Sequence, residues 1–322
     1  MIAHLDEIAY ALGDVPAVVD QSEANGLLFS TAADLSAAGF KQHHRSAPDT
    51  SAYDLGRRAV LDLEDRGAID GVDAIVYATC LTLNGNLGPT TAFEATGDVK
   101  HLMDYPASRL QAEVGLDDAV VIGLNQQACT SMLGSLRIAD ALLASEPTWD
   151  RILCVSADRF PTGAIYEQAY NLISDGAAAC TVTRSPGRYR LVASHHITNG
   201  ALGRATDDET VGTYFSYTNR VVTECLAKVG LTTADLGWVV PQNTNVHAWH
   251  ILARVWGVDP GQVWFPTLSD IGHVISSDNI VNLASLEASG QLRPGDRLVL
   301  VMAGFGLNWQ CVVLEATEAV VR

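Results

Sequence analysis

The segment NQQACTSMLGSLRIAD, residues 125–140, places Cys129 between a polar turn and a helical pattern that begins at Thr130. A thiol at a helix N-terminus meets the positive end of the helix dipole and free N–H groups, and both favour the thiolate. The same N–H groups can stabilise an oxyanion once the sulfur carries an acyl group. The local sequence therefore fits a nucleophilic cysteine, and it fits a buried thiol at a strand–helix junction equally well.

The segment SDIGHVISSDNIVN, residues 269–282, carries His273 and, five residues later, Asp278. Histidine titrates near neutral pH and suits proton transfer, while a carboxylate can fix its tautomer and stabilise the imidazolium. His273 is thus either a general base oriented by Asp278 or a loop histidine. Asp278 is either that orienting carboxylate or the N-cap of a helix that begins near Asn279, and the two roles are compatible.

His247 and His250 lie three residues apart in NVHAWHIL, on a predicted helix, and are candidates for lining the site or its entry channel. The spacing also suits two metal ligands, but no third ligand is evident, so no metal site is expected. The six cysteines form no C-x-x-C pair, which argues against a zinc ribbon or a disulfide framework. Apart from Cys129, each is expected to be a reduced, buried, small hydrophobe.

The composition narrows the class of protein. The chain has 322 residues, of which 48% are hydrophobic and 18% charged, as in a packed globular enzyme. A formal net charge of -17 disfavours nucleic acid and anionic membrane as partners. No apolar run approaches the length of a bilayer span, and the N-terminus lacks the basic start and apolar centre of a signal peptide. A cytoplasmic enzyme without a nucleic-acid or membrane partner is expected.

The elements that must position these side chains alternate between strand and helix. Continuous apolar runs of this length are typical of strands covered on both faces. The predicted strands are residues 74–80, 119–124, 151–157, 177–183, 237–242, 296–304 and 311–317. The predicted helices are residues 53–67, 130–145, 215–229, 245–256 and 279–291. The pattern indicates an α/β fold.

Two units recur in the same order. Residues 59–84 and 221–245 each run from a helix through a glycine and an aspartate to an apolar strand. Residues 125–158 and 272–304 each run from a polar turn through a helix to a strand. We therefore predict two duplicated halves, residues 1–185 with the cysteine and residues 186–322 with the His/Asp pair. The alternative is a single doubly wound sheet whose units are alike by chance, and the shared order of two consecutive units favours duplication. In the duplicated arrangement Cys129 and His273 come from corresponding places.

Four stretches together resemble ketosynthase III-type enzymes, the beta-ketoacyl-ACP synthase III family of the thiolase superfamily (ACP, acyl carrier protein). QQACTSMLGSLRIADALL is similar to the family's nucleophile segment, and NLISDGAAACTV to its Gly-Asp-Gly-Ala turn before a buried strand. LRPGDRLVLVMAGFGLNWQCVVLE is similar to its last two strands, and HHRSAPDTSAYDLGRRAVLDLEDRGAIDGVDAIVYATC to its early helix and strand. The resemblance implies a thiolase-like five-layered αβαβα fold from two duplicated halves, a homodimer and no bound cofactor.

The resemblance also implies that Cys129 takes an acyl group from an acyl-CoA or acyl-ACP donor, through the phosphopantetheine thioester. In the family a histidine and an asparagine then assist a decarboxylating second thioester. This chain has Gln242 at the histidine position, in PQNTN, and His273 at the asparagine position, in GHVIS. Gln242 cannot act as a base, which puts decarboxylative chain extension in doubt. A histidine here with an aspartate five residues on resembles the acyltransferase-type members of natural-product pathways.

The remaining site residues are also assigned by this resemblance. The GFG turn, Gly304, Phe305 and Gly306, is expected to supply a backbone N–H beside that of Cys129 for the oxyanion. Asn245 is expected to help hold the active-site loop, with Gln242 as a supporting residue. The basic residues at 40–46 and 57–58 either dock an acidic carrier protein or form a solvated surface.

The sequence thus predicts an acyltransferase with a Cys129, His273 and Asp278 site. The acyl group would pass from an ACP or CoA thioester to a hydroxyl or amine of a small acceptor in secondary metabolism. The first alternative is a non-decarboxylative carbon–carbon condensation or ring closure with His273 as base. The second is a non-catalytic ketosynthase-like partner subunit, against which the intact cysteine argues.

Overall fold

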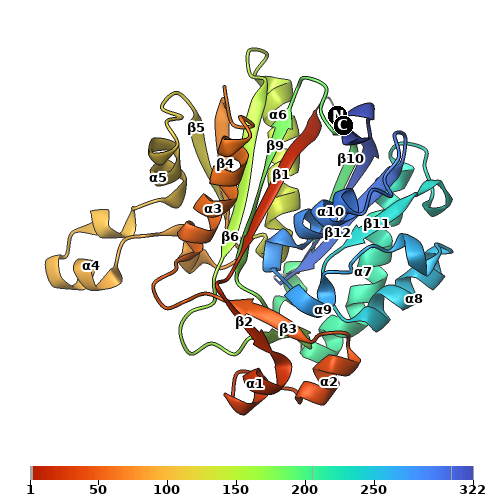
Figure 1. Ribbon diagram of the computed structural model, residues 1–322, viewed down its shortest axis with the longest axis horizontal. Coiled ribbons are helices and arrows are strands. Elements are labelled where there is room, and N and C mark those ends of the chain that lie inside the picture. Colours follow the sequence, from red (N-terminus) through yellow and green to blue (C-terminus); the bar gives the residue numbers. More distant parts are fainter. Residues whose placement is uncertain (1–2, 205, 306, 322) are drawn as a thin grey trace.

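A computed structural model describes residues 3–204, 206–305 and 307–321 (Figure 1). Its main sheet has the strand order β11-β12-β13-β10-β1-β9-β6-β4-β5. The N-terminal part supplies β1 (His4–Leu12), β4 (Ala74–Ala78), β5 (Val120–Leu124), β6 (Arg151–Asp158) and β9 (Gly176–Thr183). The C-terminal part supplies β10 (Tyr189–Thr198), β11 (Trp238–Pro241), β12 (Arg297–Gly304) and β13 (Asn308–Ala316).

The longer helices are α3 (Ala52–Asp65), α5 (Pro106–Glu113), α6 (Ser131–Ser145), α7 (Asp207–Ala227), α8 (Val246–Trp256) and α10 (Asp278–Ala288). The shorter helices are α1 (Val19–Ala24), α2 (Ala32–Ala37), α4 (Thr90–Thr96) and α9 (Leu268–Ile271). Two small two-stranded sheets pair β2 (Val15–Val18) with β3 (Gln42–Arg45) and β7 (Glu167–Gln168) with β8 (Asn171–Leu172). Two single-turn 3₁₀ helices, η3 (Ala128–Thr130) and η7 (Ile275–Ser277), precede α6 and α10.

The two parts of the sheet repeat one pairing scheme. Along β1-β9-β6-β4 the pairs are antiparallel, antiparallel and parallel, and β5 adds a further parallel strand. Along β10-β13-β12-β11 the pairs follow the same order. Only two residue pairs, His4 with Arg190 and Leu5 with Tyr189, join β1 to β10. We propose the predicted division at 185–186, between β9 and β10, as the boundary of the two halves.

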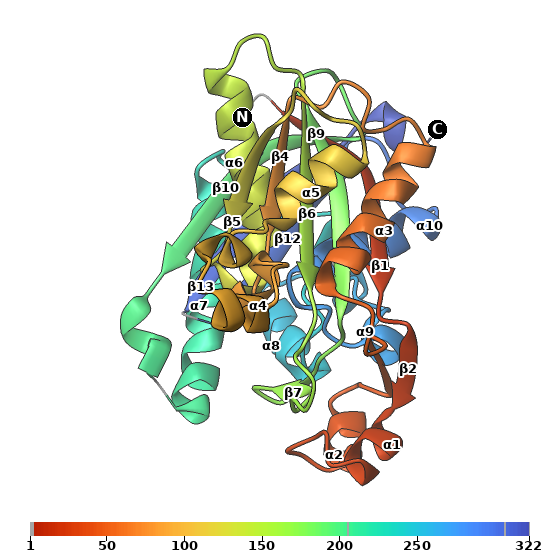
Figure 2. The same cartoon turned by 90° about the vertical axis from the view of Figure 1, so that its left-hand side faces the viewer.

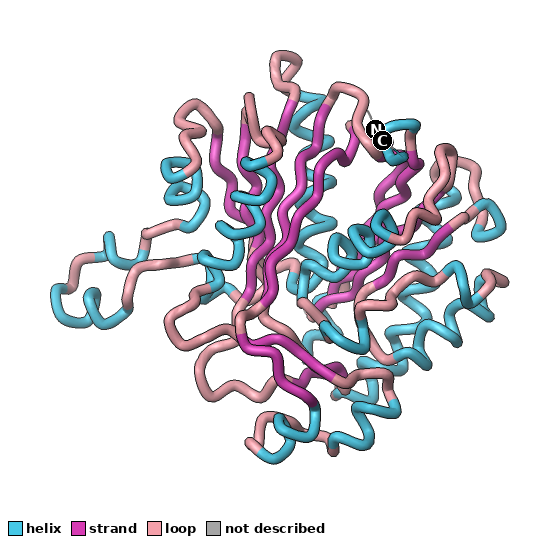
Figure 3. Tube along the Cα trace, viewed as in Figure 1, coloured by secondary structure: helices cyan, strands magenta, loops and turns pink. Residues whose placement is uncertain are grey.

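Helices cover both parts and fill the space between them (Figure 3). α6 contacts β4 and β6 on one side and β13 on the other, and α10 contacts β1 and β9 as well as β11 and β12. α3 packs on β1, β6 and β9, whereas α7 packs on β10, β12 and β13 (Figure 1). The layers are therefore helix, sheet, helix, sheet, helix. The predicted five-layered α/β fold is confirmed.

The predicted strands and helices are all present, with two kinds of difference. β1 and β10 were not predicted, because polar residues such as His4, Asp6 and His195 interrupt their apolar pattern. α7 begins at Asp207, eight residues before the predicted start, because a capping box between Thr206 and Glu209 fixes an earlier N-terminus. The capping box lies in polar sequence that carries little periodicity.

A segment with little burial extends away from the body. It contains α4 and lies between β4 and α5 (Figures 1 and 2). Val99, Met103 and Tyr105 of this segment are exposed, as is Val120 of the neighbouring edge strand β5. No described helix is both long enough and apolar enough to traverse a bilayer.

Candidate active site

Cys129 lies in a strained turn between β5 and α6. Gln126 and Ala128 have φ values of 72° and 47°, although neither is glycine. Such conformations persist only where the surroundings impose them, and they concentrate at functional sites. Here Nε2 of Gln310 donates to Oε1 of Gln127 at 2.7 Å and to the Thr130 hydroxyl at 3.1 Å. The Thr130 hydroxyl donates to the Gln127 carbonyl at 2.7 Å, so side chains from β13 hold the turn.

Gly304, the last residue of β12, lets the cysteine turn approach the sheet. A Cβ atom at Gly304 would lie 2.8 Å from the backbone nitrogen of Cys129 and 3.1 Å from Cβ of Ala128. No side chain fits in that space without displacing backbone. Because Cys129 precedes α6, its N–H is not used by the helix ladder and remains suited to an oxyanion.

His273 follows α9 at a second turn. Its backbone N–H donates to Leu172 at 2.8 Å, and its carbonyl accepts from Ser174 at 2.8 Å. These bonds tie the histidine to the end of β8 and the residues after it. Ile275, two residues on, has φ 49°, so this turn is also strained. The two turns, η3 and η7, pack on each other, and the hydroxyl of Ser131 donates to that of Ser276 at 2.8 Å.

Asp278 orients His273 and does not cap a helix. Its Oδ2 atom lies 2.5 Å from Nδ1 of His273 and accepts from the Asn243 N–H at 2.6 Å. Its Oδ1 atom accepts from the Val274 N–H at 2.6 Å. Asp278 is the first residue of α10, Ser277 is the N-cap, and no side chain caps this helix. Asp278 is fully buried, so its charge is balanced by these donors and by His273.

A layer of buried amides lies beneath the pair. Nδ2 of Asn279 donates to the carbonyl of Val240 at 2.8 Å, and Nδ2 of Asn282 donates to that of Pro241 at 3.0 Å. Asn243 joins them, because Asn282 also donates to its side-chain oxygen at 2.9 Å. This network fixes the end of β11 against α10. The backbone of Asn243 is thereby held where its N–H meets Asp278.

The titration of the pair follows from these contacts. Burial opposes a charge on His273, but the charge and hydrogen bond of Asp278 and the contact with Cys129 outweigh it and raise the pKa of His273 to about 10. The Cys80 thiol and His273 both hydrogen-bond to Cys129 and lower the pKa of Cys129, although burial acts in the opposite sense. Both shifts favour a thiolate on Cys129 beside an imidazolium on His273 at neutral pH. This state is competent to attack a thioester.

Cys80 was expected to be an ordinary buried thiol, and that expectation was wrong. It lies beside Cys129, and its contact with that thiol, with burial, raises the pKa of Cys80. Cys80 therefore stays protonated and donates to the thiolate. Asp158, at the end of β6, fixes this loop by accepting from the N–H groups of Cys80 at 2.8 Å and Leu81 at 2.9 Å. Burial raises the pKa of Asp158 to about 7. The sequence did not identify Cys80 and Asp158 as site residues, because they approach Cys129 only when β4, β5 and β6 lie side by side in the fold.

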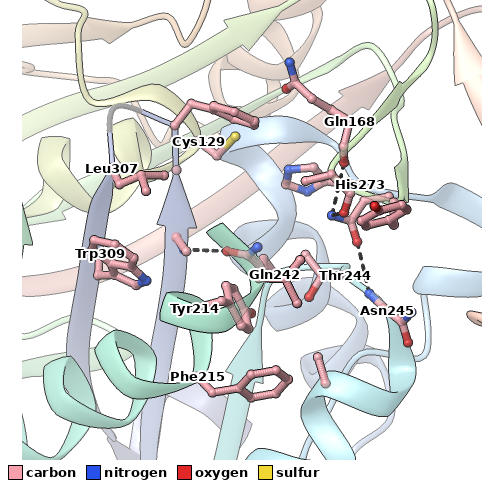
Figure 4. A pocket seen from close by; sticks show the side chains of 18 of the residues that line it. Cys129, Gln168, Tyr214, Phe215, Gln242, Thr244, Asn245, His273, Leu307 and Trp309 are labelled. Atoms are coloured by element: carbon pink, nitrogen blue, oxygen red, sulfur yellow. Dashed lines mark hydrogen bonds between the residues drawn. The ribbon is translucent and has the colours of Figure 1, made fainter. Parts of the chain in front are cut away.

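Cys129 and His273 open into one pocket of about 290 Å³ (Figure 4). Its walls include Tyr214, Phe215, Leu307 and Trp309, and none of its described lining residues is Lys, Arg, Asp or Glu. The pocket therefore suits an uncharged, largely apolar group. Among the described residues, no group of three or more His, Cys, Asp and Glu side chains could hold a metal ion.

The other predicted site residues are distributed as follows. Gln242, Asn245, His247, Gly304 and Phe305 line the pocket. Asn245 is the N-cap of α8, since its side chain accepts from the His247 N–H at 2.9 Å. Gly306 lies outside the described residues.

His250 is not among the described residues that line the pocket, and its place at the entry channel stays a prediction. The α8 residues that line the pocket are His247, Ala248 and Ile251.

The basic segment near the N-terminus is not a free cationic patch. His43 is buried, and its burial lowers its pKa to about 4. Arg57 pairs with Glu113 at 2.7 Å, and Arg58 pairs with Asp14. Part of its charge is therefore absent or paired, whereas no ion pair of Lys41 or Arg45 is present among the described residues, and carrier-protein docking stays a prediction.

Comparisons with known proteins agree with the fold and show the family. Residues 125–200 match the model of 3-oxoacyl-[acyl-carrier-protein (ACP)] synthase III, and residues 226–316 match the model of its C-terminal part. Together the two matches span just over half of the chain. The beta-ketoacyl-[acyl-carrier-protein] synthase III of Chlamydia caviae is 26% identical over an alignment of 314 positions, and the match covers 87% of this chain and 87% of that protein.

Two solved structures are similar over almost the whole chain. A structure named ChlB3 acyltransferase has a TM-score of 0.81 at 21% identity and covers 99% of both chains. The 3-oxoacyl-(acyl carrier protein) synthase III of Pseudomonas aeruginosa has a TM-score of 0.81 at 23% identity and covers 98% of both. At this identity the structures show the fold, and the matched models show the family. The chain belongs to the ketosynthase III-like enzymes of the thiolase superfamily.

Proposed function

We propose that the protein is an acyltransferase that uses Cys129 as nucleophile, His273 as acid and base, and Asp278 as the orienting carboxylate. The observation that carries this proposal is the buried contact of 2.5 Å between His273 and Asp278, with His273 and Cys129 in one pocket. A nucleophile, a base and a carboxylate in that order form the arrangement used for acyl transfer in many unrelated folds.

The proton balance of both half-reactions follows from the resting ion pair. In the first, the Cys129 thiolate attacks the donor thioester, the donor carbon–sulfur bond breaks, and the leaving thiolate takes the His273 proton. His273 is then neutral beside an acyl-cysteine. In the second, the acceptor attacks the acyl carbon, gives its proton to His273 and displaces the Cys129 thiolate. The thiolate and imidazolium are thereby restored without any other proton source.

The donor and acceptor are proposed by class. The family matches support an acyl-ACP or acyl-CoA thioester as donor, with no bound cofactor. The similarity to a structure named ChlB3 acyltransferase supports acyl transfer. We propose that the acceptor is a small molecule of secondary metabolism, acylated on a hydroxyl or an amine. A site with Cys129 as its nucleophile uses no resident cofactor chemistry in either half-reaction.

A second candidate function is carbon–carbon bond formation. The matched models are those of condensing enzymes, and His273 could deprotonate a carbon acid in place of a hydroxyl. Against decarboxylative condensation, Gln242 occupies the place where the resemblance puts an acid–base histidine. The two products differ chemically, because an ester is cleaved by mild base and a carbon–carbon bond is not.

We also propose a homodimer. β5 is the edge of the sheet, its sequence VVIGL is apolar, and Val120 is 46% exposed. An open apolar edge strand promotes pairing with another chain unless it is covered. A second copy would cover both β5 and the exposed segment that contains α4. Native mass spectrometry should give twice the chain mass, and Val120→Lys should shift it to the monomer; a monomeric wild type would contradict this proposal.

The function is tested by intact-protein mass spectrometry with a panel of acyl-CoA and acyl-pantetheine thioesters. Wild type should gain one acyl mass, and Cys129→Ala should gain none. His273→Ala should load and then fail to transfer. The proposal fails if no thioester loads Cys129, or if His273→Ala transfers acyl groups at the wild-type rate.

A further inference from the structure

The Gln242 side chain is fixed in one orientation. β11 pairs with β12 only as far as Pro241 opposite Val301, so the next inward-facing N–H of β12, that of Ala303, lies beyond the partner strand. Oε1 of Gln242 accepts from this N–H at 2.5 Å. A backbone N–H can only donate, so the contacting atom is the amide oxygen and the nitrogen is turned the other way.

The free end of this amide faces the reacting groups. Gln242 is 5% exposed and lines the same pocket as Cys129 and His273. Figure 4 shows its nitrogen directed toward the space below Cys129 and His273. No hydrogen bond from Nε2 to another described residue is present. The Gln242 Nε2 donor therefore opens into the pocket, where a bound molecule can supply its acceptor.

We infer that Gln242 is a specificity-determining residue that selects oxygen nucleophiles, so that the acceptor of this enzyme is an alcohol and not an amine. This inference rests on the proposed acyl transfer and decides which of its two acceptor classes the site takes. The amide donates one N–H to the attacking atom while His273 removes the proton from that atom. Gln242 and His273 thus hold the nucleophile from two sides.

The selection follows from lone-pair counting. A hydroxyl oxygen has two lone pairs, one to attack the acyl carbon of Cys129 and one to accept from Gln242, and its O–H donates to His273. A neutral amine has one lone pair, which the attack consumes. Its nitrogen then presents only N–H groups to the Gln242 N–H, and two donors facing each other repel. In both cases the acyl–sulfur bond breaks, and His273 keeps the proton.

The test compares matched acceptors on enzyme that has already been loaded. Wild type and Gln242→Met carrying the same acyl group on Cys129 are mixed with 2,2,2-trifluoroethanol or 2,2,2-trifluoroethylamine, whose amine is largely uncharged near neutral pH. We expect Gln242→Met to slow transfer to the alcohol by roughly 10- to 100-fold, the effect of removing one preorganised donor. Transfer to the amine should change by less than about threefold, which is within the effect of a neutral contact.

Hydrolysis provides a second readout that needs no acceptor. Water also has two lone pairs, so loss of the acyl group to water should slow in parallel with transfer to the alcohol. Gln242→Glu tests the same point if Gln242→Met folds poorly, because the carboxylate keeps an oxygen for Ala303 and removes the donor. It should also lower the ratio of alcohol to amine transfer. Differences in how fast the variants are loaded do not affect these rates, since both rates are measured from enzyme that already carries the acyl group.

Gln262→Met is the matched control. Nε2 of Gln262 donates to Leu236 at 2.9 Å and Gly237 at 3.1 Å, so it supports a loop outside the pocket. Its ratio of alcohol to amine transfer should equal that of wild type. Equal slowing of both acceptors by Gln242→Met would overturn the inference and leave only a structural role for Gln242. Wild type that fails to load would instead overturn the proposed function, and this inference with it.

Discussion

The turn of Cys129 and the turn of His273 occupy equivalent places in the two halves, yet they are stabilised differently. Each precedes a central-layer helix, α6 or α10, and each contains a non-glycine residue with positive φ, Ala128 or Ile275. The cysteine turn is held from outside, by Gln310 of β13 and by the close approach of Gly304. The histidine turn is held by backbone bonds to Leu172 and Ser174 and, unlike the cysteine turn, by a carboxylate of its own helix, that of Asp278.

The difference follows from the charge that each turn carries. A thiolate needs donors and a nearby cation, which the Cys80 thiol and His273 supply. An imidazolium in the same buried place needs a fixed anion, and Asp278 must in turn be satisfied by backbone N–H groups. In the proposed mechanism, these different buried environments suit the Cys129 turn to a nucleophile and the His273 turn to a base.

The largest effect on activity is expected when the Asp278 carboxylate is removed from the histidine turn. We expect Asp278→Asn to lower the rate of acyl transfer by about 10³-fold, since loss of the carboxylate of a triad commonly costs this much or more. The imidazolium loses its partner, and the pKa of His273 falls. Single-turnover transfer from loaded enzyme measures the effect. Asp62→Asn, at an exposed position of α3, should behave as wild type, and equal rates for Asp278→Asn would refute the assignment.

A smaller effect is expected on the reactivity of the thiol. Because the pKa of Cys129 is lowered and that of His273 is raised to about 10, thiolate and imidazolium coexist at neutral pH. The pair is lost when pH falls through the lowered pKa of Cys129 or rises through that of His273. Alkylation by iodoacetamide at pH 7 should therefore be about 10- to 100-fold faster in wild type than in His273→Ala, whose thiol titrates nearer its usual value.

The alkylation rate should also change with pH in a different direction and range in the two proteins. Wild type should be flat around neutrality and slow down only in acid. His273→Ala should rise steeply as pH increases through the alkaline range. Matching profiles for the two proteins would show that His273 does not lower the pKa of Cys129.

The external support of the cysteine turn is tested at Gly304. Gly304→Ala places a methyl group 2.8 Å from the Cys129 nitrogen, so the turn must move. We expect about a tenfold slower loading and a loss of about 1–3 kcal/mol in the free energy of unfolding, as for other overpacked sites. Gly203→Ala, with no atom within 4 Å of the added carbon, should change neither. Normal loading in Gly304→Ala would mean that the turn does not depend on this contact.

The smallest effect is expected from substitution of Cys80, and it tests whether the Cys80 thiol supports the Cys129 thiolate. Cys80→Ala removes one donor to the thiolate but leaves His273 in place, so alkylation at neutral pH should slow by about 3- to 10-fold, as for one charge-assisted hydrogen bond. Cys80→Ser keeps a donor and should restore most of the rate. If Cys80→Ala and wild type alkylate equally at all pH values, the Cys80 thiol does not support the nucleophile.

Much of the architecture was readable from local sequence. The apolar runs of β4, β9 and β12 are continuous because both faces of the sheet are covered, and this pattern predicted them. The order of units predicted the repeat, and the resemblance named the fold. β1 and β10 were not predicted, because polar residues interrupt their apolar pattern. The start of α7 was predicted too late, because its capping box lies in polar sequence.

The sequence by itself determined the chemical identities: a cysteine before a helix, and a histidine with an aspartate five residues later in the other half. It left Asp278 between orienting His273 and capping a helix, because both need the same residue at nearly the same position. Tertiary structure decided this, since only the folded chain places the Asp278 oxygens on His273, Asn243 and Val274. It also placed Cys80, Asp158 and Gln242 against partners that are distant in sequence and that meet them only in the folded chain.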